Sequence, residues 1–359
     1  MRVILKDQTA DELAARLAGT GVKPALARRL QAAAVARDRW LEPGPGISDR
    51  VLAEVRRVAD LPRLTVLDRV ESPVDGFVRY LLRGAGPDPF EAVRIPLLHR
   101  PGEPKYVACV SSQVGCGMGC AFCRTGRLGF RRQLATWEMV DQVVRIAADS
   151  PHPVRGVVFM GMGEPFLNYE SVIRAARVLA EPCGMAIAAK AITISTVGVV
   201  PGIRRFTAEG HSFRLVVSLT SAVPERRRVL LPVEGTWPTS ELIAALREYQ
   251  AASRQRVTLA WTMIAGVNTG VDEARQLATL VRGIPVKLDL IDVNDPAGRF
   301  RPPGPAELAA FRDALRSELG QPVARRYSGG ADIGAACGLL AGAARAPASP
   351  AAPEDRPPC

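Results

Sequence analysis

Three cysteines stand close together in a glycine-rich stretch of the chain, at Cys116, Cys120 and Cys123. Their spacing, three residues and then two, lets three thiolates face one compact inorganic group. Closed zinc sites take four protein ligands, and iron-sulfur clusters of the ferredoxin type usually take four cysteines. The triplet therefore predicts a 4Fe-4S cluster with one iron left open, at which a small chelating molecule can bind.

Two alternatives remain for the triplet: three unrelated thiols, or a zinc site completed by a distant residue. The chain has only 3 histidines, and His152 and His211 are the two that follow the triplet. This scarcity disfavours zinc. Because the cysteines are clustered as ligands and no secretory signal precedes them, we expect a protein of the reducing cytoplasm.

The composition is that of a globular protein with an excess of positive charge. The 359 residues are 47% hydrophobic and carry a formal net charge of +11. Such a charge predicts a polyanionic partner, RNA first; the alternative is a GC-rich genome that favours arginine codons. The longest uncharged run, 106–123, is rich in Gly, Ser and Cys, so no membrane span is expected. The arginines cluster at 131–132, 204–205, 226–228 and 325–326.

Patterning divides the chain into four parts. Residues 1–62 alternate charged residues with Ala and Leu at helical spacing, which predicts a small helical domain whose third helix, 50–58, is capped by Asp49. Residues 63–104 alternate like antiparallel strands and form a β-rich connector that carries Glu91. The main domain is expected at 105–345, and the Ala/Pro/Ser-rich tail 346–359 is expected to be disordered.

From residue 105 onward, short apolar strands alternate with amphipathic helices, the pattern of βα units around a parallel sheet. Six such units predict an α/β fold: a partial (β/α)6 barrel of the TIM type, open at one side. A last short helix is expected at 332–341, and Cys183 and Cys359 are expected to be bystanders. The expected strands are 106–111, 156–160, 191–195, 214–219, 257–263 and 285–291, and the expected helices are 137–148, 169–179, 240–252, 271–282 and 306–318, with Thr136, Asn168, Thr239 and Gly270 at their N-caps.

Several motifs occur in a fixed order along the chain. They are Cys109-Val-Ser-Ser-Gln-Val-Gly-Cys116, the cysteine triplet, Val158-Phe-Met-Gly-Met-Gly-Glu-Pro165, Ile194-Ser-Thr-Val-Gly-Val-Val-Pro201 and Asp332-Ile-Gly-Ala-Ala-Cys-Gly338. The triplet has the spacing of the radical S-adenosylmethionine (SAM) superfamily, and the set together resembles the RlmN/Cfr family of RNA methyltransferases. The resemblance covers about residues 64–342. It implies a radical-SAM partial barrel, one 4Fe-4S cluster whose free iron SAM would occupy, and methylation of adenine in RNA.

By this resemblance, two further cysteines take part in the reaction. Adenine ring carbons and the SAM methyl group are both electrophilic, so a radical route avoids a direct attack that could not proceed. Cys337 would take a methyl group from one SAM, and a second SAM would supply the radical that removes a hydrogen from it. Cys109 would then release the product by a transient disulfide with Cys337, and Glu91 would be the base. From the residues alone, Glu91 is an exposed strand carboxylate, Cys109 a buried thiol and Cys337 a small core residue.

The barrel places its ligands at the carboxyl ends of its strands. Glycines there allow the backbone to approach a ligand, and a carboxylate can accept from the SAM amino group. Hydroxyl and amide groups suit the ribose and carboxylate of SAM. The SAM contacts expected on this basis are Gly163, Glu164, Ser195, Ser218, Leu219, Thr220 and Asn294.

Three departures from the family pattern indicate a divergent member. Thr220 stands where His is usual, 289–294 replaces a more typical Asn-Leu-Ile-Pro-aromatic-Asn, and Ala260-Trp261 replaces a Glu-aromatic pair. We therefore expect a cytoplasmic, monomeric adenine methyltransferase with large-subunit rRNA, and also tRNA, as candidate substrates, C2 ahead of C8, and flavodoxin or ferredoxin as electron donor. The alternatives are a radical-SAM enzyme acting on a peptide or metabolite, and a non-catalytic RNA-binding relative.

Overall fold

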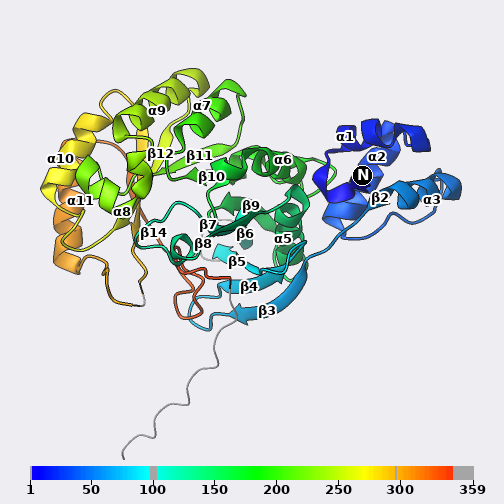
Figure 1. The fold of residues 1–359 in the computed structure, drawn as a ribbon, viewed down its shortest axis with the longest axis horizontal. Coiled ribbons are helices and arrows are strands. Elements are labelled where there is room, and N and C mark those ends of the chain that lie inside the picture. Colours follow the sequence, from blue (N-terminus) through cyan, green and yellow to red (C-terminus); the bar gives the residue numbers. More distant parts are fainter. Residues whose placement is uncertain (1, 98–102, 296, 343–359) are drawn as a thin grey trace, which may run out of the picture.

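The computed structural model describes residues 2–97, 103–295 and 297–342. The tail 346–359, with Cys359, lies outside the described residues. Figure 1 shows a large sheet wrapped by helices, with a group of blue N-terminal helices at one side. No helix in the described ranges is long and apolar enough to cross a membrane.

One sheet of ten strands organises the described residues, in the order β14-β13-β12-β11-β10-β9-β6-β5-β4-β3. The seven strands β6 and β9 to β14 are parallel to one another, and β5, β4 and β3 extend the sheet from β6 by antiparallel pairing. The parallel strands are β6 (Lys105–Cys109), β9 (Val154–Phe159), β10 (Ile192–Thr196), β11 (Arg214–Ser218), β12 (Val257–Met263), β13 (Val286–Asp292) and β14 (Val323–Arg326). The added strands are β3 (Thr65–Glu71), β4 (Val78–Arg83) and β5 (Phe90–Leu97).

Helices alternate with the parallel strands, as βα units require. The fold is the expected α/β partial barrel, and all six expected strands are present. The structure adds a seventh parallel strand, β14. The sequence did not predict this strand, because its two arginines interrupt the apolar pattern. The helices of the barrel are α5 (Thr136–Ala148), α6 (Tyr169–Ala180), α7 (Val200–Ala208), α8 (Pro224–Leu230), α9 (Thr239–Ser253), α10 (Val271–Leu280) and α11 (Pro305–Leu319).

Some local expectations were wrong. Residues 332–341 form turns rather than a helix, because Gly334 and Gly338 take left-handed φ angles of 72° and 84° that interrupt helical backbone. Helices α7 and α8 were missed because each is short and opens with proline in its first turn. The N-cap positions of α3, α5 and α9 are held by Ser48, Ala135 and Pro238, each one residue before the expected Asp49, Thr136 and Thr239.

The N-terminal helices are α1 (Ala10–Arg16), α2 (Pro24–Gln31) and α3 (Asp49–Val58). A capping box of Thr9 and Glu12 starts α1. Lys6, fully buried, forms ion pairs with Asp141 of α5 and, at 2.6 Å, with Asp38. These helices are therefore fastened to the barrel through a buried charge network, which is costly to break from either side.

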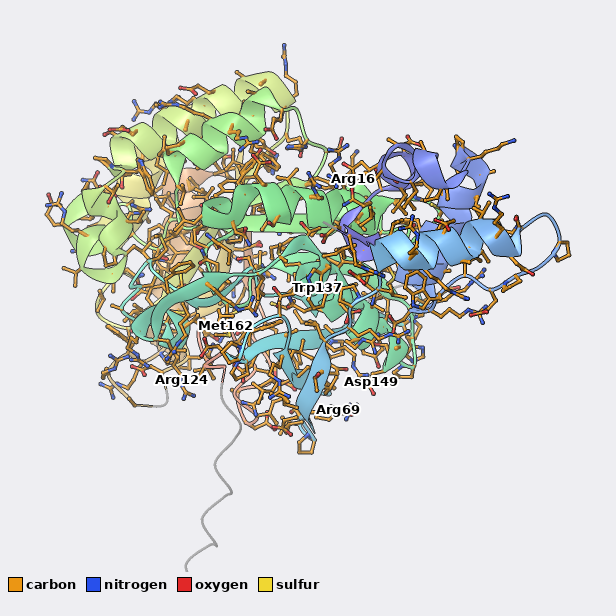
Figure 2. All side chains as sticks on the ribbon, turned by 45° about the vertical axis from the view of Figure 1, so that its right-hand side comes forward. Arg16, Arg69, Arg124, Trp137, Asp149 and Met162 are labelled. Atoms are coloured by element: carbon orange, nitrogen blue, oxygen red, sulfur yellow. The ribbon has the colours of Figure 1, made fainter. Side chains whose placement is uncertain are left out.

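The antiparallel strands are tied to the barrel by Asp149, which follows α5. Its carboxylate accepts hydrogen bonds from Tyr80 at 2.5 Å and Arg69 at 2.8 Å, and its backbone oxygen accepts one from Arg94 at 2.9 Å. Figure 2 labels Arg69 and Asp149 on this side of the molecule. The connector thus continues the barrel sheet, and it carries Glu91 on β5.

Candidate active site

The three clustered cysteines lie on one loop, which runs from the first strand of a small hairpin to a one-turn helix that precedes the second strand. Cys116 ends β7 (Gln113–Cys116), which pairs with β8 (Gly129–Gln133), and Cys123 directly precedes α4 (Arg124–Arg127). The amide of Ala121 donates to the carbonyl of Leu230 at 3.0 Å, so the loop is held against the end of α8.

The thiol set fits an iron-sulfur cluster. Burial raises the pKa of Cys116 to about 12 and that of Cys120 further, and the neighbouring cysteines add to both shifts. Thiolates are therefore disfavoured here unless a positive group lies among them, which is what the irons of a cluster supply. In the described part of the chain no three His, Cys, Asp or Glu side chains converge as ligands of a single ion. A cubane cluster binds its three protein thiolates at three different irons, so it does not require them to converge on a single ion.

Neither histidine after the triplet serves as a further ligand. The Nε2 atom of His211 lies 2.7 Å from the Glu209 carboxylate, and the His152 ring stacks on Tyr106 with centroids 6.0 Å apart. Both are thus engaged in packing and pairing elsewhere, which removes the support for a zinc site completed by histidine.

The glycine-rich turn after β9 lies against β7. Gly163 has a φ of +102°, and a Cβ there would come within 2.6 Å of Gln113. The Gln113 side chain accepts from the amide of Glu164 at 2.8 Å and thereby fixes the turn. Sequence reasoning missed Gln113, because nothing in local spacing marks a glutamine that supports a turn 51 residues away.

Glu164 is buried beneath this turn. One carboxylate oxygen accepts from the amide of Phe166 at 3.0 Å and the other from the amide of Val197 at 2.9 Å. Burial raises the pKa of Glu164 to about 7. A nearby ammonium group would favour the ionised form, so an amino acid amine is a chemically suitable partner.

The expected hydroxyl contacts lie at one edge of the sheet. Ser195 is in β10, Ser218 ends β11, and Leu219 and Thr220 follow it. Thr220 is a non-glycine residue at φ +62°, fully buried, and its Oγ1 has no hydrogen-bond partner among the described residues. A strained backbone together with an unpaired buried hydroxyl fits a position shaped for a ligand.

Asn294 lies two residues after β13 and contacts the segment of Cys337. Its amide donates to the carbonyl of Cys337 at 3.3 Å and to Ser328 Oγ at 3.2 Å, while the amide of Cys337 donates to the same Ser328 Oγ at 3.0 Å. Asn294 therefore positions this turn, and Ser328 is a second positioning residue that sequence reasoning missed.

Cys109 and Cys337 are distant in the chain but near enough in the fold for the charge of Cys337 to affect the pKa of Cys109. Burial raises the pKa of Cys109 to about 12, with Cys337 as the next contribution and Arg326 opposing it. Cys337 is exposed, contrary to its reading as a small core residue, whereas Cys109 is buried as expected. Both are free thiols in the described structure, so a standing disulfide is not supported.

Glu91 is buried rather than exposed, which corrects the reading from sequence alone. One carboxylate oxygen accepts from the amides of Ala341 and Gly342, at 2.6 and 3.0 Å, and the other pairs with Arg79 at 3.1 Å. Burial raises the pKa of Glu91, while the two amides and Arg79 oppose the shift. The side chain thus joins β5 to the segment that carries Cys337.

The arginine clusters are largely committed to pairing within the protein. Arg227 is fully buried against Glu234, and its guanidinium also donates to the carbonyls of Val197 at 2.8 Å and Leu219 at 3.2 Å. The net charge is therefore a poorer guide to RNA binding than the sequence implied. The other paired arginines of the clusters are Arg131, Arg132, Arg204, Arg205, Arg226, Arg325 and Arg326.

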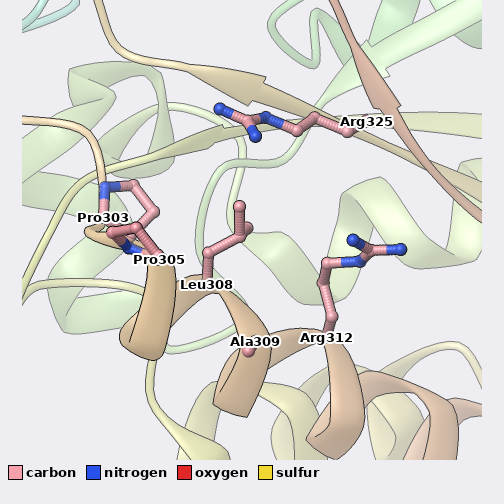
Figure 3. Close-up of a pocket in the computed structure, with 6 residues that line it drawn as sticks. All are labelled: Pro303, Pro305, Leu308, Ala309, Arg312 and Arg325. Carbon is pink, nitrogen blue, oxygen red and sulfur yellow. The ribbon is translucent and has the colours of Figure 1, made fainter.

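A pocket of about 380 Å³ lies between α11 and β14 (Figure 3). Its wall is apolar and its rim carries two arginines. Arg325 pairs with Asp292 at 2.5 Å, so Arg312 is the cation less constrained by the protein. The lining residues are Pro303, Pro305, Leu308, Ala309, Arg312 and Arg325.

Comparison with known proteins agrees with this geometry. Residues 110–278 match the model of the radical SAM superfamily. A crystal structure of a radical SAM methyltransferase from Sphaerobacter thermophilus is 36% identical and superposes with a TM-score of 0.85, over 95% of this chain and all of that one. The fold and the cysteine triplet thus define a radical SAM enzyme, a class that uses a 4Fe-4S cluster and SAM.

Sequence relatives narrow the class. The chain is 49% identical to a protein of Myxococcus xanthus described as a probable RNA methyltransferase, with 94% of both chains covered. It is 40% identical to the dual-specificity RNA methyltransferase RlmN of Syntrophobacter fumaroxidans, over 94% of this chain and 98% of that one. The chain belongs to the RlmN-type family of radical SAM RNA methyltransferases.

Proposed function

We propose that this protein methylates a ring carbon of adenine in RNA, C2 in preference to C8, through an S-methylated Cys337. The substrate proposed first is large-subunit rRNA, with tRNA as a second. The observation that carries the proposal is the pair of Cys337 and Cys109, one exposed and one buried, beside the three-cysteine loop.

The cluster and SAM, when bound, supply the methyl group and the radical chemistry. The exposed side chain of Cys337, and the hold of Ser328 and Asn294 on its backbone, support its proposed role as carrier of the methyl group in a thioether. A carrier must present its carbon to the substrate in one orientation, and a turn fixed at both backbone groups achieves this.

Cys109 is proposed to release the product. Its thiolate attacks the Cys337 sulfur, an S–S bond forms, and the bond from that sulfur to the transferred carbon breaks with its electron pair on the carbon, which takes a proton. Burial raises the pKa of Cys109, so the thiol stays protonated and unreactive in the free protein, with Arg326 favouring its ionisation. A cellular thiol must then reduce the disulfide, which suits a reducing cytoplasm.

Glu91 is proposed as the base that removes the ring proton, and its geometry supports a second role. A raised pKa makes a carboxylate a better base near neutral pH. Its hydrogen bonds to Ala341 and Gly342 also anchor the segment of Cys337. We propose that Glu91 reaches the base only when substrate loosens this anchor.

The proposed SAM ligands are Gly163 and Glu164 for the amino group and Ser195, Ser218, Leu219, Thr220 and Asn294 for the remainder. The unpaired hydroxyl of Thr220 supports the contact proposed for Thr220, and the raised pKa of Glu164 supports the contact proposed for Glu164. The firm tie of Asn294 to Ser328 makes its part in SAM binding indirect.

Intact-protein mass spectrometry tests the proposal. Cys109→Ala and Cys337→Ala variants are purified from growing cells and treated with ribonuclease before analysis. We expect Cys109→Ala to retain a covalent nucleotide and Cys337→Ala to carry none. The adduct of Cys109→Ala, fragmented further, identifies the base and the ring carbon.

A Cys183→Ala variant is the control, because this cysteine lies 3.3 Å from Gln31 of the N-terminal helices, far from the site in sequence and structure. It should behave as the parent protein. If neither active-site variant carries RNA while both still cleave SAM, the RNA assignment fails and the peptide or metabolite alternative takes its place.

A further inference from the structure

The hairpin that holds the cysteine loop presents exposed side chains to which the proposed reaction assigns no role. We define the Arg124 surface as the exposed side chains Arg124, Arg127, Leu128 and Phe130. Leu128 is 44% exposed and Phe130 50%, and both arginines are exposed. Figure 2 labels Arg124 at the periphery of the molecule.

This surface is joined directly to the cysteine loop. In the β7–β8 pairing, Cys116 lies opposite Gly129 and Gly115 opposite Phe130. A Cβ at Gly117 would be 3.6 Å from the Cβ of Phe130, so the phenylalanine lies over the loop. Cys123 is the residue immediately before Arg124. Among the described residues, no other large exposed apolar side chains lie this close along the chain to the cysteines.

The surface is also strongly positive. The sequence has no Asp or Glu between Glu103 and Glu138. Within the described ranges the side chains of Arg124 and Arg127 form no ion pair, whereas Arg132 is held by Glu138 at 2.9 Å. Two unpaired guanidinium groups therefore flank two apolar side chains.

We propose that the Arg124 surface is the docking site of an acidic one-electron donor protein of the flavodoxin kind. The inference rests on the assignment of a cluster to the three cysteines and deepens the proposed function by locating a partner. In the productive complex the donor loses one electron and the cluster gains one, and no proton or group is transferred. Electron transfer weakens steeply with distance, so the donor must bind close to the cysteine loop.

Composition favours a protein partner at this surface. Aromatic residues and arginine are enriched at the centres of protein interfaces. Charge complementarity to an acidic protein steers association and fixes orientation. An RNA strand would use the arginines but would gain less from Leu128. RNA binding at this surface is therefore an outcome that the experiment must separate from donor binding.

Another side of the cysteine loop packs against the segment that carries Cys337. The amide of Arg124 donates to the carbonyl of Gly338 at 2.8 Å, and Thr125 Oγ1 donates to the carbonyl of Leu340 at 2.7 Å. The segment of Cys337 thus packs behind α4, where Figure 1 shows the red C-terminal segment beside the hairpin. A donor on the outer surface leaves the Cys337 side to the substrate.

The test uses the full protein with its cluster and the double variant Arg124→Glu/Arg127→Glu. Binding of a purified acidic flavodoxin is measured by fluorescence titration, and cluster reduction by stopped-flow absorbance, once with reduced flavodoxin and once with dithionite. We expect the flavodoxin Kd to rise at least tenfold and reduction by subsaturating flavodoxin to slow by a similar factor. Reduction by dithionite should not change.

The control variant is Arg214→Glu/Arg256→Glu, which makes the same charge change. These exposed arginines stand at the start of β11 and immediately before β12, the opposite end of the strands. It should bind flavodoxin within twofold of the parent. Arg124→Lys/Arg127→Lys, which keeps the charge, should recover most of the lost affinity.

Three outcomes overturn the proposal: unchanged flavodoxin affinity in the double variant, an equal loss in the control variant, or a loss of RNA affinity as large as the loss of flavodoxin affinity. Because neither flavodoxin binding nor cluster reduction requires RNA, these readouts stand apart from the mass-spectrometric test of the substrate. A failure of that test leaves the docking result intact.

Discussion

The buried pair of Arg227 and Glu234 should be essential to the stability of the barrel. Arg227 of α8 is fully buried and donates to Glu234 and to backbone carbonyls after β10 and β11. Glu234 is 2% exposed and also accepts from the amide and the hydroxyl of Thr239, at 2.9 and 2.8 Å. Replacing Arg227 by methionine removes the cation and leaves the carboxylate buried.

The expected cost follows from the burial of both partners. Breaking a buried pair from one side destabilises a protein by about 3–5 kcal/mol, because the remaining charge is desolvated and uncompensated. Arg227→Met and Glu234→Leu should each show this loss in the free energy of unfolding. The double variant Arg227→Met/Glu234→Leu removes both charges, so its loss should be far smaller than the sum of the single losses.

Urea unfolding of the parent, the two single variants, the double variant and one control, monitored by circular dichroism, measures these free energies. Arg228→Met is the matched control, since its side chain is exposed on the same helix; it should lie within about 0.5 kcal/mol of the parent. Cluster content after anaerobic reconstitution should fall in Arg227→Met, because the end of α8 holds the cysteine loop through Leu230. Equal losses for Arg227→Met and Arg228→Met, or additive losses in the double variant, would refute the reasoning.

Three further predictions follow from other contacts. Gly163→Ala should abolish SAM binding measured by equilibrium dialysis, because the new methyl group would lie 2.6 Å from a neighbouring side chain, whereas Gly210→Ala, at φ +65° in open space, should bind SAM normally. Lys6→Met should lower the free energy of unfolding by on the order of 0.5–3 kcal/mol, since it removes one of two cations that pair with the fully buried Asp141 and leaves Arg145 at 3.3 Å as the other. Limited proteolysis should then release the N-terminal helices; unchanged protection would contradict this. Burial raises the pKa of Asp7 from 3.8 to about 6, so between these pH values the folded protein holds a proton that the unfolded chain has released. The free energy of unfolding should therefore fall, by on the order of 3 kcal/mol, as the pH rises from about 4 through 6. In Asp7→Asn, the free energy from urea unfolding should change less over the same pH range.

Local patterns predicted the elements of the barrel well. Apolar runs and helical periodicity depend on which face of an element is buried, and this is written in consecutive residues. Elements with a weak local signature were missed, namely β14, with its two arginines, and the short helices α7 and α8. The turns at 332–341 were misread as a helix because an Ala-rich composition outweighed two glycines whose φ angles only the fold reveals.

The cluster ligands of the site were also predictable, because their signal lies in residues that are close in sequence. The types and spacing of Cys116, Cys120 and Cys123 indicate a cluster, because metal ligands close in sequence must be close in space. The environments of Glu91 and Cys337 were not predictable. Glu91 contacts the backbone 250 residues away, and burial and exposure at these positions depend on that packing.

The sequence by itself determined the ligand set, the alternation of strands and helices and the order of the motifs, since each depends on residues near one another in the chain. Only the tertiary structure decided which charges meet. It buried Arg227 against Glu234, placed Cys109 within electrostatic range of Cys337, and left Arg124 and Arg127 exposed next to the cysteine loop. The physical reason is that desolvation and pairing are properties of the folded environment, which brings together residues whose separation along the chain carries no local signal.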